Sequence, residues 1–209
     1  MIALSPADGR MGGMLPFSIP PHRQEIACQQ VLTEDSSVFS IQWSVVPAPF
    51  LAHLTPEALL NRYLAHIRRC TATIVRPRRS AAGIRFCLFG SRWSLLSFRP
   101  PAVERQAVVL RISGGLLVQR DRCQRGELRF RIGEEPGGIR VSLELSGYYP
   151  SILGSLSPPP WRRLLYHLSQ AAVHRLVTVR FLTLLYRELT GSSAPVRVVS
   201  VKVRDGVPV

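Results

Sequence analysis

The feature that most constrains the fold is a long apolar segment near the C-terminus, Trp161 to Leu189. Three consecutive prolines precede it and Gly191 follows it, which is the usual punctuation of an α-helix. A helix of roughly 29 residues is about 43 Å long at 1.5 Å per residue, enough to lie across a whole sheet. Arginines interrupt the segment at intervals, so we do not expect it to span a membrane.

The distribution of side chains around this helix predicts which side is buried. On a helical wheel a broad apolar face consists of Trp161, Leu165, Leu168, Ala172, Leu176, Val179 and Leu182. We therefore expect Leu168, Ala172 and Leu176 to be buried against a sheet. The opposite side carries Arg163, His167, Gln170 and His174 in its first half. We interpret these as a solvated face. Phe181 and Leu185 continue that side in apolar form, so the end of the helix should be more deeply covered.

Most of the chain before this helix has the pattern of β-strands. The clearest strand is Phe39–Val45, where apolar residues alternate with serine and glutamine at the period of two that a half-buried strand requires. Other strands are expected at Ile26–Leu32, Thr71–Val75, Ile84–Phe89, Trp93–Phe98, Ala107–Ile112, Leu116–Gln119, Glu127–Ile132 and Ile139–Leu145. In the last two strands apolar and polar or charged residues alternate, which predicts an antiparallel sheet with one wet face.

A second helix is expected from Thr55 to about Arg69. Thr55 can cap it, Pro56 suits the first helical position and Glu57 places an acid in the first turn. The order of elements predicts an α+β fold: a curved antiparallel sheet wrapped around the long C-terminal helix. We expect an irregular N-terminal arm over residues 1–24, a single domain over 25–191, and a tail over 192–209 that could carry a short strand.

This order of elements resembles the helix-grip fold of the START/Bet v 1-like superfamily, which includes polyketide cyclases and lipid-transfer domains. The resemblance covers roughly residues 37–190 and rests on the Phe39–Val45 strand and the Trp161–Leu189 helix. It departs from the usual pattern in having one good helix, rather than two short ones, after the first strand. The resemblance is to the many uncharacterised bacterial members of that superfamily, and it implies a ligand cavity between the sheet and the C-terminal helix, where its members often bind ligands.

Five residues are candidates to line such a cavity: Trp43, Tyr149, Leu168, Ala172 and Leu176. Each has a plainer explanation as ordinary packing. Trp43 is centred on the apolar face of its strand and fits a core position. Tyr149 belongs to a Gly-Tyr-Tyr-Pro segment where the last strand leads towards the long helix, and a tyrosine there can point into a cavity or pack at the rim.

The charge of the chain has two explanations. The net charge is +14, and Lys202 is the only lysine among 27 basic residues. A GC-rich genome encodes arginine where others encode lysine, in which case no function follows. Alternatively, the charge attracts an anionic partner such as nucleic acid or anionic lipid. The arginines are spread along the whole chain, so we expect weak, salt-sensitive contact with anionic polymers or membranes and no specific nucleic acid.

No motif for a metal, a cofactor or a known catalytic apparatus is found. The four cysteines do not form a Cys-x-x-Cys pair, and His167 and His174 are seven residues apart, unlike the usual spacing of metal ligands on a helix. We therefore expect no metal and no cofactor. The first residues lack the pattern of a signal peptide, which favours a cytoplasmic location.

Three classes of function follow. The first is a carrier or sensor that holds a hydrophobic small molecule or lipid in a cavity between sheet and helix. The second is a cyclase-type enzyme that uses the same cavity, with Tyr149 and His167 as available polar groups. The third is a protein that binds nucleic acid or an anionic membrane through its arginines. Only the first two depend on the helix-grip resemblance, and the sequence identifies no ligand.

Overall fold

The register in which the strands pair decides which side chains face the helices. A computed structural model describes residues 23–49, 54–155, 157–204 and 207–208 of the chain. The predicted N-terminal arm lies almost wholly outside this part, and Gln24 already belongs to the first strand. The strands are β1 Gln24–Leu32, β2 Val38–Val46, β3 Val75–Ser80, β4 Gly83–Leu88, β5 Ser94–Phe98, β6 Ala102–Val103, β7 Ala107–Gly114, β8 Glu127–Glu135, β9 Gly138–Tyr148, β10 Val196–Ser200, β11 Val203–Arg204 and β12 Val207–Pro208.

Ten of these strands form one curved, unclosed sheet in the order β10-β1-β2-β9-β8-β7-β5-β4-β3, with β6 added beside β7. All neighbours are antiparallel except β10, which pairs in parallel with β1. The sheet is therefore mixed at this edge, where a wholly antiparallel sheet was expected. β10 comes from the tail, and β11 and β12 form a separate small ribbon after it.

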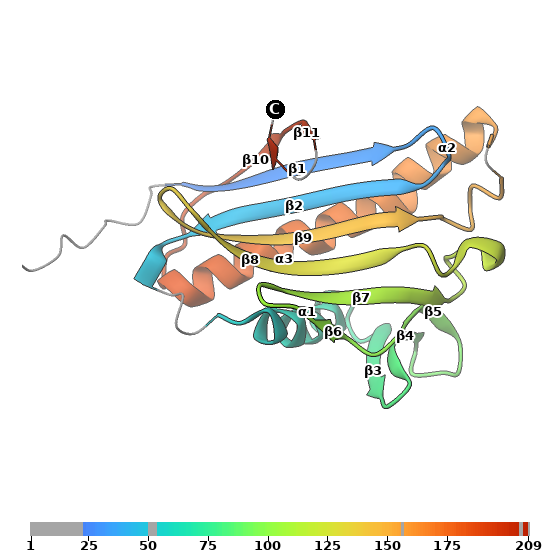
Figure 1. Ribbon diagram of the computed structural model, residues 1–209, viewed down its shortest axis with the longest axis horizontal. Coiled ribbons are helices and arrows are strands. Elements are labelled where there is room, and N and C mark those ends of the chain that lie inside the picture. Colours follow the sequence, from blue (N-terminus) through green and yellow to red (C-terminus); the bar gives the residue numbers. More distant parts are fainter. Residues whose placement is uncertain (1–22, 50–53, 156, 205–206, 209) are drawn as a thin grey trace, which may run out of the picture.

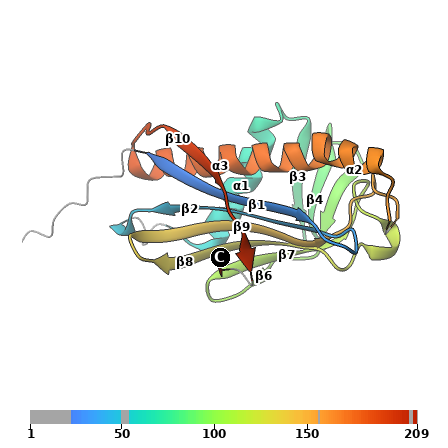
Figure 2. The ribbon, with the colours of Figure 1, turned by 90° about the horizontal axis from the view of Figure 1, so that it is seen from above.

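Two helical segments lie on one face of the sheet (Figure 1). α1, Pro56–Cys70, begins as predicted, with the Thr55 hydroxyl accepting a hydrogen bond from the Ala58 amide. The long helix runs as α2, Pro160–Tyr166, a π-helical turn η3, His167–Ala171, and α3, Ala172–Thr190. Gly191 ends it in the left-handed conformation, as expected. Seen from above, the helices lie on one side of the sheet, and β3 and β4 rise to the level of the long helix (Figure 2).

The alternation predicted for β8 and β9 is confirmed. Their apolar residues face the helices and belong to the main core, in which Phe130, Val141 and Leu143 are fully buried. Apart from Glu134 at the end of β8, their charged residues lie on the outer face, where Arg129 pairs with Glu127 at 3.0 Å. The α+β architecture, a curved sheet packed around a long C-terminal helix, is thus as predicted.

The predicted inner face of β2 is wrong. In antiparallel pairs, residues directly opposite one another share a face of the sheet. Trp43 pairs with Ser142, on the outer face of β9, whereas Gln42 pairs with Leu143, on the face that packs against the helices. The alternation was therefore correctly recognised but its direction was inverted.

Both faces of β2 are covered, and this is why alternation misled. On the outer face Trp43 packs with Ala27 and Ile41 in a small second cluster, to which Val199 and Val201 of the tail contribute. On the inner face the buried polar residues bond to one another, with Gln42 Nε2 donating to Ser40 Oγ at 2.6 Å. The tail thus covers apolar residues that would otherwise be exposed.

Two other predicted strands do not form as expected. Thr71–Ile74 is a turn after α1, in which Ala72 and Thr73 have positive φ and the Thr71 hydroxyl donates to the carbonyl of Ile67. β3 therefore begins only at Val75. The segment Leu116–Gln119 contains a single isolated bridge, Val118 to Pro150. The remainder of that connection includes a short 3-10 turn, η2, Arg120–Arg122.

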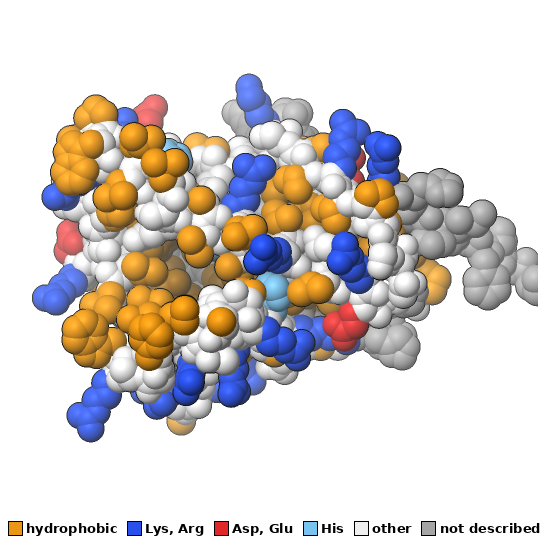
Figure 3. All heavy atoms as spheres, turned by 180° about the vertical axis from the view of Figure 1, so that it is seen from behind, with side chains coloured by type: hydrophobic (Ala, Val, Ile, Leu, Met, Phe, Trp, Pro, Cys, Tyr) orange, Lys and Arg blue, Asp and Glu red, His pale blue; other side chains and the backbone are white. Residues whose placement is uncertain are grey.

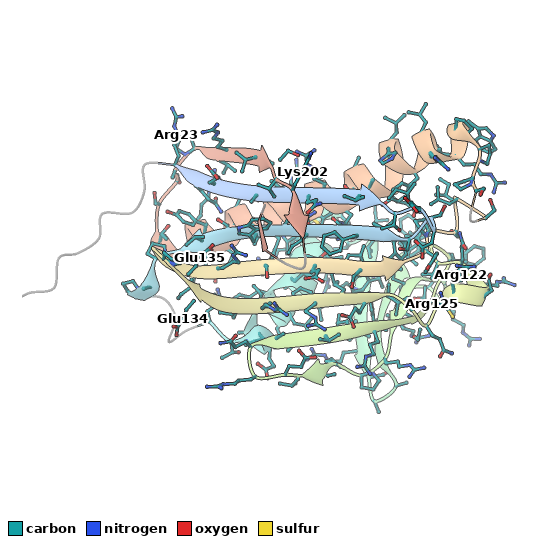
Figure 4. All side chains as sticks on the ribbon, turned by 45° about the horizontal axis from the view of Figure 1, so that its top comes forward. Arg23, Arg122, Arg125, Glu134, Glu135 and Lys202 are labelled. Atoms are coloured by element: carbon teal, nitrogen blue, oxygen red, sulfur yellow. The ribbon has the colours of Figure 1, made fainter. Side chains whose placement is uncertain are left out.

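Charged side chains are distributed over the surface and not gathered on one element. Figure 4 shows Glu134 and Glu135 at one end of the sheet, Arg122 and Arg125 at the opposite end, and Lys202 on the tail. No helix in the part of the chain that the structure describes is long and apolar enough to cross a membrane.

Candidate functional site

The long helix is rotated relative to the prediction. Leu168 is 70% exposed and Leu176 is 51% exposed, and Ala172 is exposed beside them, so the expectation that these three are buried against the sheet is wrong. The buried residues of the helix are Tyr166, Ala171, Thr178, Phe181, Leu182, Leu185 and Tyr186. The stripe that leads to Phe181 and Leu185 lies against the sheet, and of the apparent apolar face only Leu182 is buried.

This rotation places a cavity of about 320 Å³ between the sheet, α1 and the first half of the long helix. Its size is at the lower end of the range for pockets that hold small molecules. The lining residues come from eleven segments of the chain: Gln30, Tyr63, Ile67, Thr71, Val75, Phe86, Leu95, Leu96, Leu117, Leu145, Tyr148, Tyr166, Ser169, Gln170, Val173, His174 and Val177. Seen from behind, the molecule is hollowed between two groups of hydrophobic side chains (Figure 3).

The lining is apolar with a few polar groups, and none of its members is an acid, an arginine or a lysine. Tyr148 Oη lies 2.7 Å from the carbonyl oxygen of Leu117 and 3.0 Å from Gln170 Oε1, either of which can accept its single hydrogen. Tyr166 Oη accepts a hydrogen bond from Gln30 Nε2 at 3.4 Å. Burial raises the pKa of Tyr148 and raises that of Tyr166 to about 12, so both hydroxyls are neutral.

His174 is the most unusual polar group in the lining. Its side chain is only partly covered, yet both ring nitrogens are shielded from solvent and neither has a hydrogen-bond partner. Burial lowers its pKa to about 4, so the imidazole is neutral near pH 7. His66, on α1, differs from it because His66 Nε2 lies 3.2 Å from the carbonyl oxygen of Val177, a backbone partner.

The π-helical turn lies at the cavity. η3 spans His167–Ala171 and contributes Ser169 and Gln170 to the lining, directly before His174. Such turns insert a residue into an α-helix and are frequent at functional sites. Here the turn lies between Tyr166 and His174, both of which line the cavity.

None of the five predicted site residues lines this cavity. Tyr149 is buried at the end of β9, where its hydroxyl bonds to Asp35 and the guanidinium of Arg122 lies 4.9 Å from its ring centre. Its neighbour Tyr148 lines the cavity instead. Trp43 borders a hollow of about 210 Å³ at the beginning of β1, which Tyr186 of the long helix also lines, and the guanidinium of Arg140 lies 4.9 Å from the Trp43 ring centre.

The three predicted helix residues lie on the outside of the helix. Ala172 and Leu176 border a hollow of about 400 Å³ between the helix and Val198 of β10. Leu168 faces away from the cavity. The hypothesis that these residues contact a ligand stays a prediction.

Sequence reasoning missed His174 and Gln170, which it placed on a solvated face. A signal was available, because Phe181 and Leu185 continue the same side of the helix and are buried. Only the part of the polar stripe nearest to these residues, Gln170 and His174, lines the cavity, whereas Arg163 and His167 are exposed as predicted. Tyr166, one turn before Gln170, belongs to the same stripe and is also buried.

A larger hollow of about 730 Å³ lies beside the cavity region, but it is an open depression of the surface. It is lined by side chains such as Arg92, Trp93, Leu116 and Arg120, which the structure leaves exposed or partly exposed. Among the described residues, no three His, Cys, Asp or Glu side chains come together in a way that could hold a metal ion.

Comparisons with known proteins identify no family. No protein-family model matches the chain, and no curated protein matches it. Two solved structures of CalU16 from Micromonospora echinospora are similar to it. The alignment with the crystal structure has 14% sequence identity and a TM-score of 0.40, and it covers 79% of this chain and 85% of the CalU16 chain. The alignment with the solution NMR structure has 16% sequence identity and a TM-score of 0.38, and it covers 87% of this chain and 82% of the CalU16 chain. The fold assignment rests on the strand order and helix placement of the chain itself.

Proposed function

We propose that this protein binds a small molecule with a largely apolar body in the cavity between the sheet, α1 and the long helix. The observation that carries the proposal is the cavity itself, a hollow of about 320 Å³ with an apolar lining and a few convergent polar groups. Such a combination is typical of small-molecule sites. Burial of an apolar ligand there is favourable by about 25 cal/mol for each Å² of apolar surface removed from water.

The helix-grip resemblance supports the same proposal, because that fold is expected to hold ligands between the sheet and the C-terminal helix. Membership of the START/Bet v 1-like superfamily, a lipid as the ligand and a cytoplasmic location are parts of this proposal. The cyclase-type alternative named Tyr149 and His167, and neither lines the cavity, so no observation of these two groups favours catalysis.

The test is a titration of the protein with a neutral fluorescent probe, N-phenyl-1-naphthylamine. Val177 lines the cavity, so Val177→Phe places a ring in the space that the probe needs. Leu184, on the same helix, is half exposed and does not line the cavity, so Leu184→Phe is the matched control. We expect saturable binding to the parent and to Leu184→Phe, and at least tenfold weaker binding to Val177→Phe. Equal binding to all three folded proteins would show that the probe does not occupy this cavity.

A further inference from the structure

Both ring nitrogens of His174 lack a partner in the protein although they are shielded from solvent. Buried polar groups in folded proteins are almost always hydrogen-bonded, and a neutral imidazole carries one donor and one acceptor. His66 follows that rule through the carbonyl of Val177. His174 lines the cavity with its nitrogens closed off from it, and a half-turn of the ring about the Cβ–Cγ bond, which exchanges nitrogen and carbon positions, is the step that lets a ligand supply the missing partner.

Gln170 lies one helical turn before His174 and also lines the cavity. Residues four apart share one face of a helix, so the two side chains are neighbours. Gln170 Oε1 lies 3.0 Å from the hydroxyl of Tyr148. When Oε1 accepts that hydrogen, the Nε2 amide keeps both of its hydrogens for another acceptor. Together the pair can offer donors and an acceptor to a single oxygen atom of a ligand.

The charge of the lining restricts the class of ligand. No lining residue is Asp, Glu, Arg or Lys, and the buried hydroxyls of Tyr63, Tyr148 and Tyr166 have raised pKa values. Burial also disfavours the charged form of His174. An ionised carboxylate, phosphate or amine would therefore enter without a counter-charge, which is strongly unfavourable.

We propose that His174, with Gln170 beside it, is the polar anchor of the cavity and that the natural ligand carries a neutral hydroxyl or carbonyl group on an otherwise apolar frame. This inference rests on the proposed function and specifies the ligand class for the same site. A hydroxyl can donate to the free nitrogen of His174 and accept from the Gln170 amide. A carbonyl can accept from both.

The test compares three probes that share a naphthalene frame: 2-naphthol, 2-methylnaphthalene and 2-naphthoate. We expect the parent to bind 2-naphthol about tenfold more tightly than 2-methylnaphthalene, and 2-naphthoate most weakly. His174→Leu should abolish the preference for 2-naphthol and leave the affinity for 2-methylnaphthalene unchanged or higher. His174→Gln, which keeps hydrogen-bonding groups, should restore part of the preference.

The outcomes separate the two proposals. If neither neutral probe binds the parent, the proposed function itself fails. If both bind with equal affinity, or if His174→Leu keeps the full preference, the anchor is refuted while the cavity remains. Tightest binding of 2-naphthoate refutes the neutral ligand class. A measurement on the parent alone covers the case in which a variant does not fold. In ¹⁵N-labelled protein, the resonances of the His174 ring nitrogens should shift on addition of 2-naphthol and not on addition of 2-methylnaphthalene. The absence of such a selective shift refutes the anchor.

Discussion

The buried imidazole of His174 makes the stability of the protein depend on pH in a defined window. An ordinary histidine has a pKa of about 6.5, and burial lowers that of His174 to about 4. Above pH 6.5 the side chain is neutral in both the folded and the unfolded chain, so its protonation costs nothing. Between pH 6.5 and pH 4 the unfolded chain takes up a proton that the folded chain does not, and the free energy of unfolding falls. Below pH 4 the folded chain is protonated too, and the loss levels off.

The size of this effect follows from the two pKa values. A difference of one pKa unit corresponds to 1.36 kcal/mol, so the change from about 6.5 to about 4 corresponds to roughly 3 kcal/mol of stability lost across the window. His174→Gln removes the titrating group, so the variant should keep that stability. The assay is urea unfolding of parent and variant at several pH values between 7.5 and 3.5. The quantity to follow is the difference between their free energies of unfolding.

The difference between the two proteins is needed because other groups titrate in the same range. Burial also lowers the pKa of His66, and Asp35 has a lowered pKa because it accepts hydrogen bonds from Thr33, Tyr149 and Ser37. Their contributions are common to parent and variant and cancel. Leu184→Gln, at a half-exposed position of the same helix, removes no titrating group and is the control that should follow the parent. Curves for parent and His174→Gln that stay parallel from pH 7.5 to 3.5 would refute the burial of this imidazole.

The remaining predictions concern the helix and the charge. Leu182→Ala should lower the free energy of unfolding by about 2–5 kcal/mol because Leu182 is only 1% exposed, whereas Leu168→Ala should change it by no more than about 0.5 kcal/mol. Equal losses for the two variants in chemical unfolding would contradict the helix orientation. Labelled oligonucleotides and anionic vesicles should bind at low salt, through counterion release, and be largely released near 0.15 M salt; tight, selective binding that persists there would favour a dedicated nucleic-acid or membrane function.

Much of the fold could be predicted because it depends on local patterns. The cap at Thr55, the glycine at 191 and the alternation in β8 and β9 are signals that act within a few residues, and each is present in the structure. The order of strands and helices then leaves few arrangements in which the apolar face of the sheet is covered. The α+β architecture follows from that restriction.

The site could not be predicted in the same way because it depends on which of two similar faces is turned inwards. β2 is buried on both sides, with polar residues such as Gln42 beneath the helix and Trp43 beneath the tail, so alternation does not reveal its inner face. The long helix likewise has two stripes rich in large side chains. The stripe with Leu168 and Leu176 has the cleaner pattern, but the other ends in Phe181 and Leu185, which fill the core.

The buried polar groups of β1 and β2 explain part of this choice. Gln24 Nε2 donates to Ser44 Oγ at 3.2 Å and to the carbonyl oxygen of Leu182 at 3.1 Å, which ties the inner face of the sheet to the long helix. A contact of this kind joins residues 158 positions apart in the chain. No pattern within a single segment indicates it.

The central claim is that a ligand binds on the inner side of the long helix and not on the side with the cleaner apolar pattern. Methyl-labelled protein distinguishes the two directly, because leucine and valine methyl groups lie on both sides. On addition of 2-naphthol, the methyl resonances of Leu96, Leu117 and Val177 should shift in a saturable way, and those of Leu168 and Leu176 should stay unchanged. Saturable shifts at Leu168 and Leu176, with Leu96, Leu117 and Val177 unaffected, would contradict the claim.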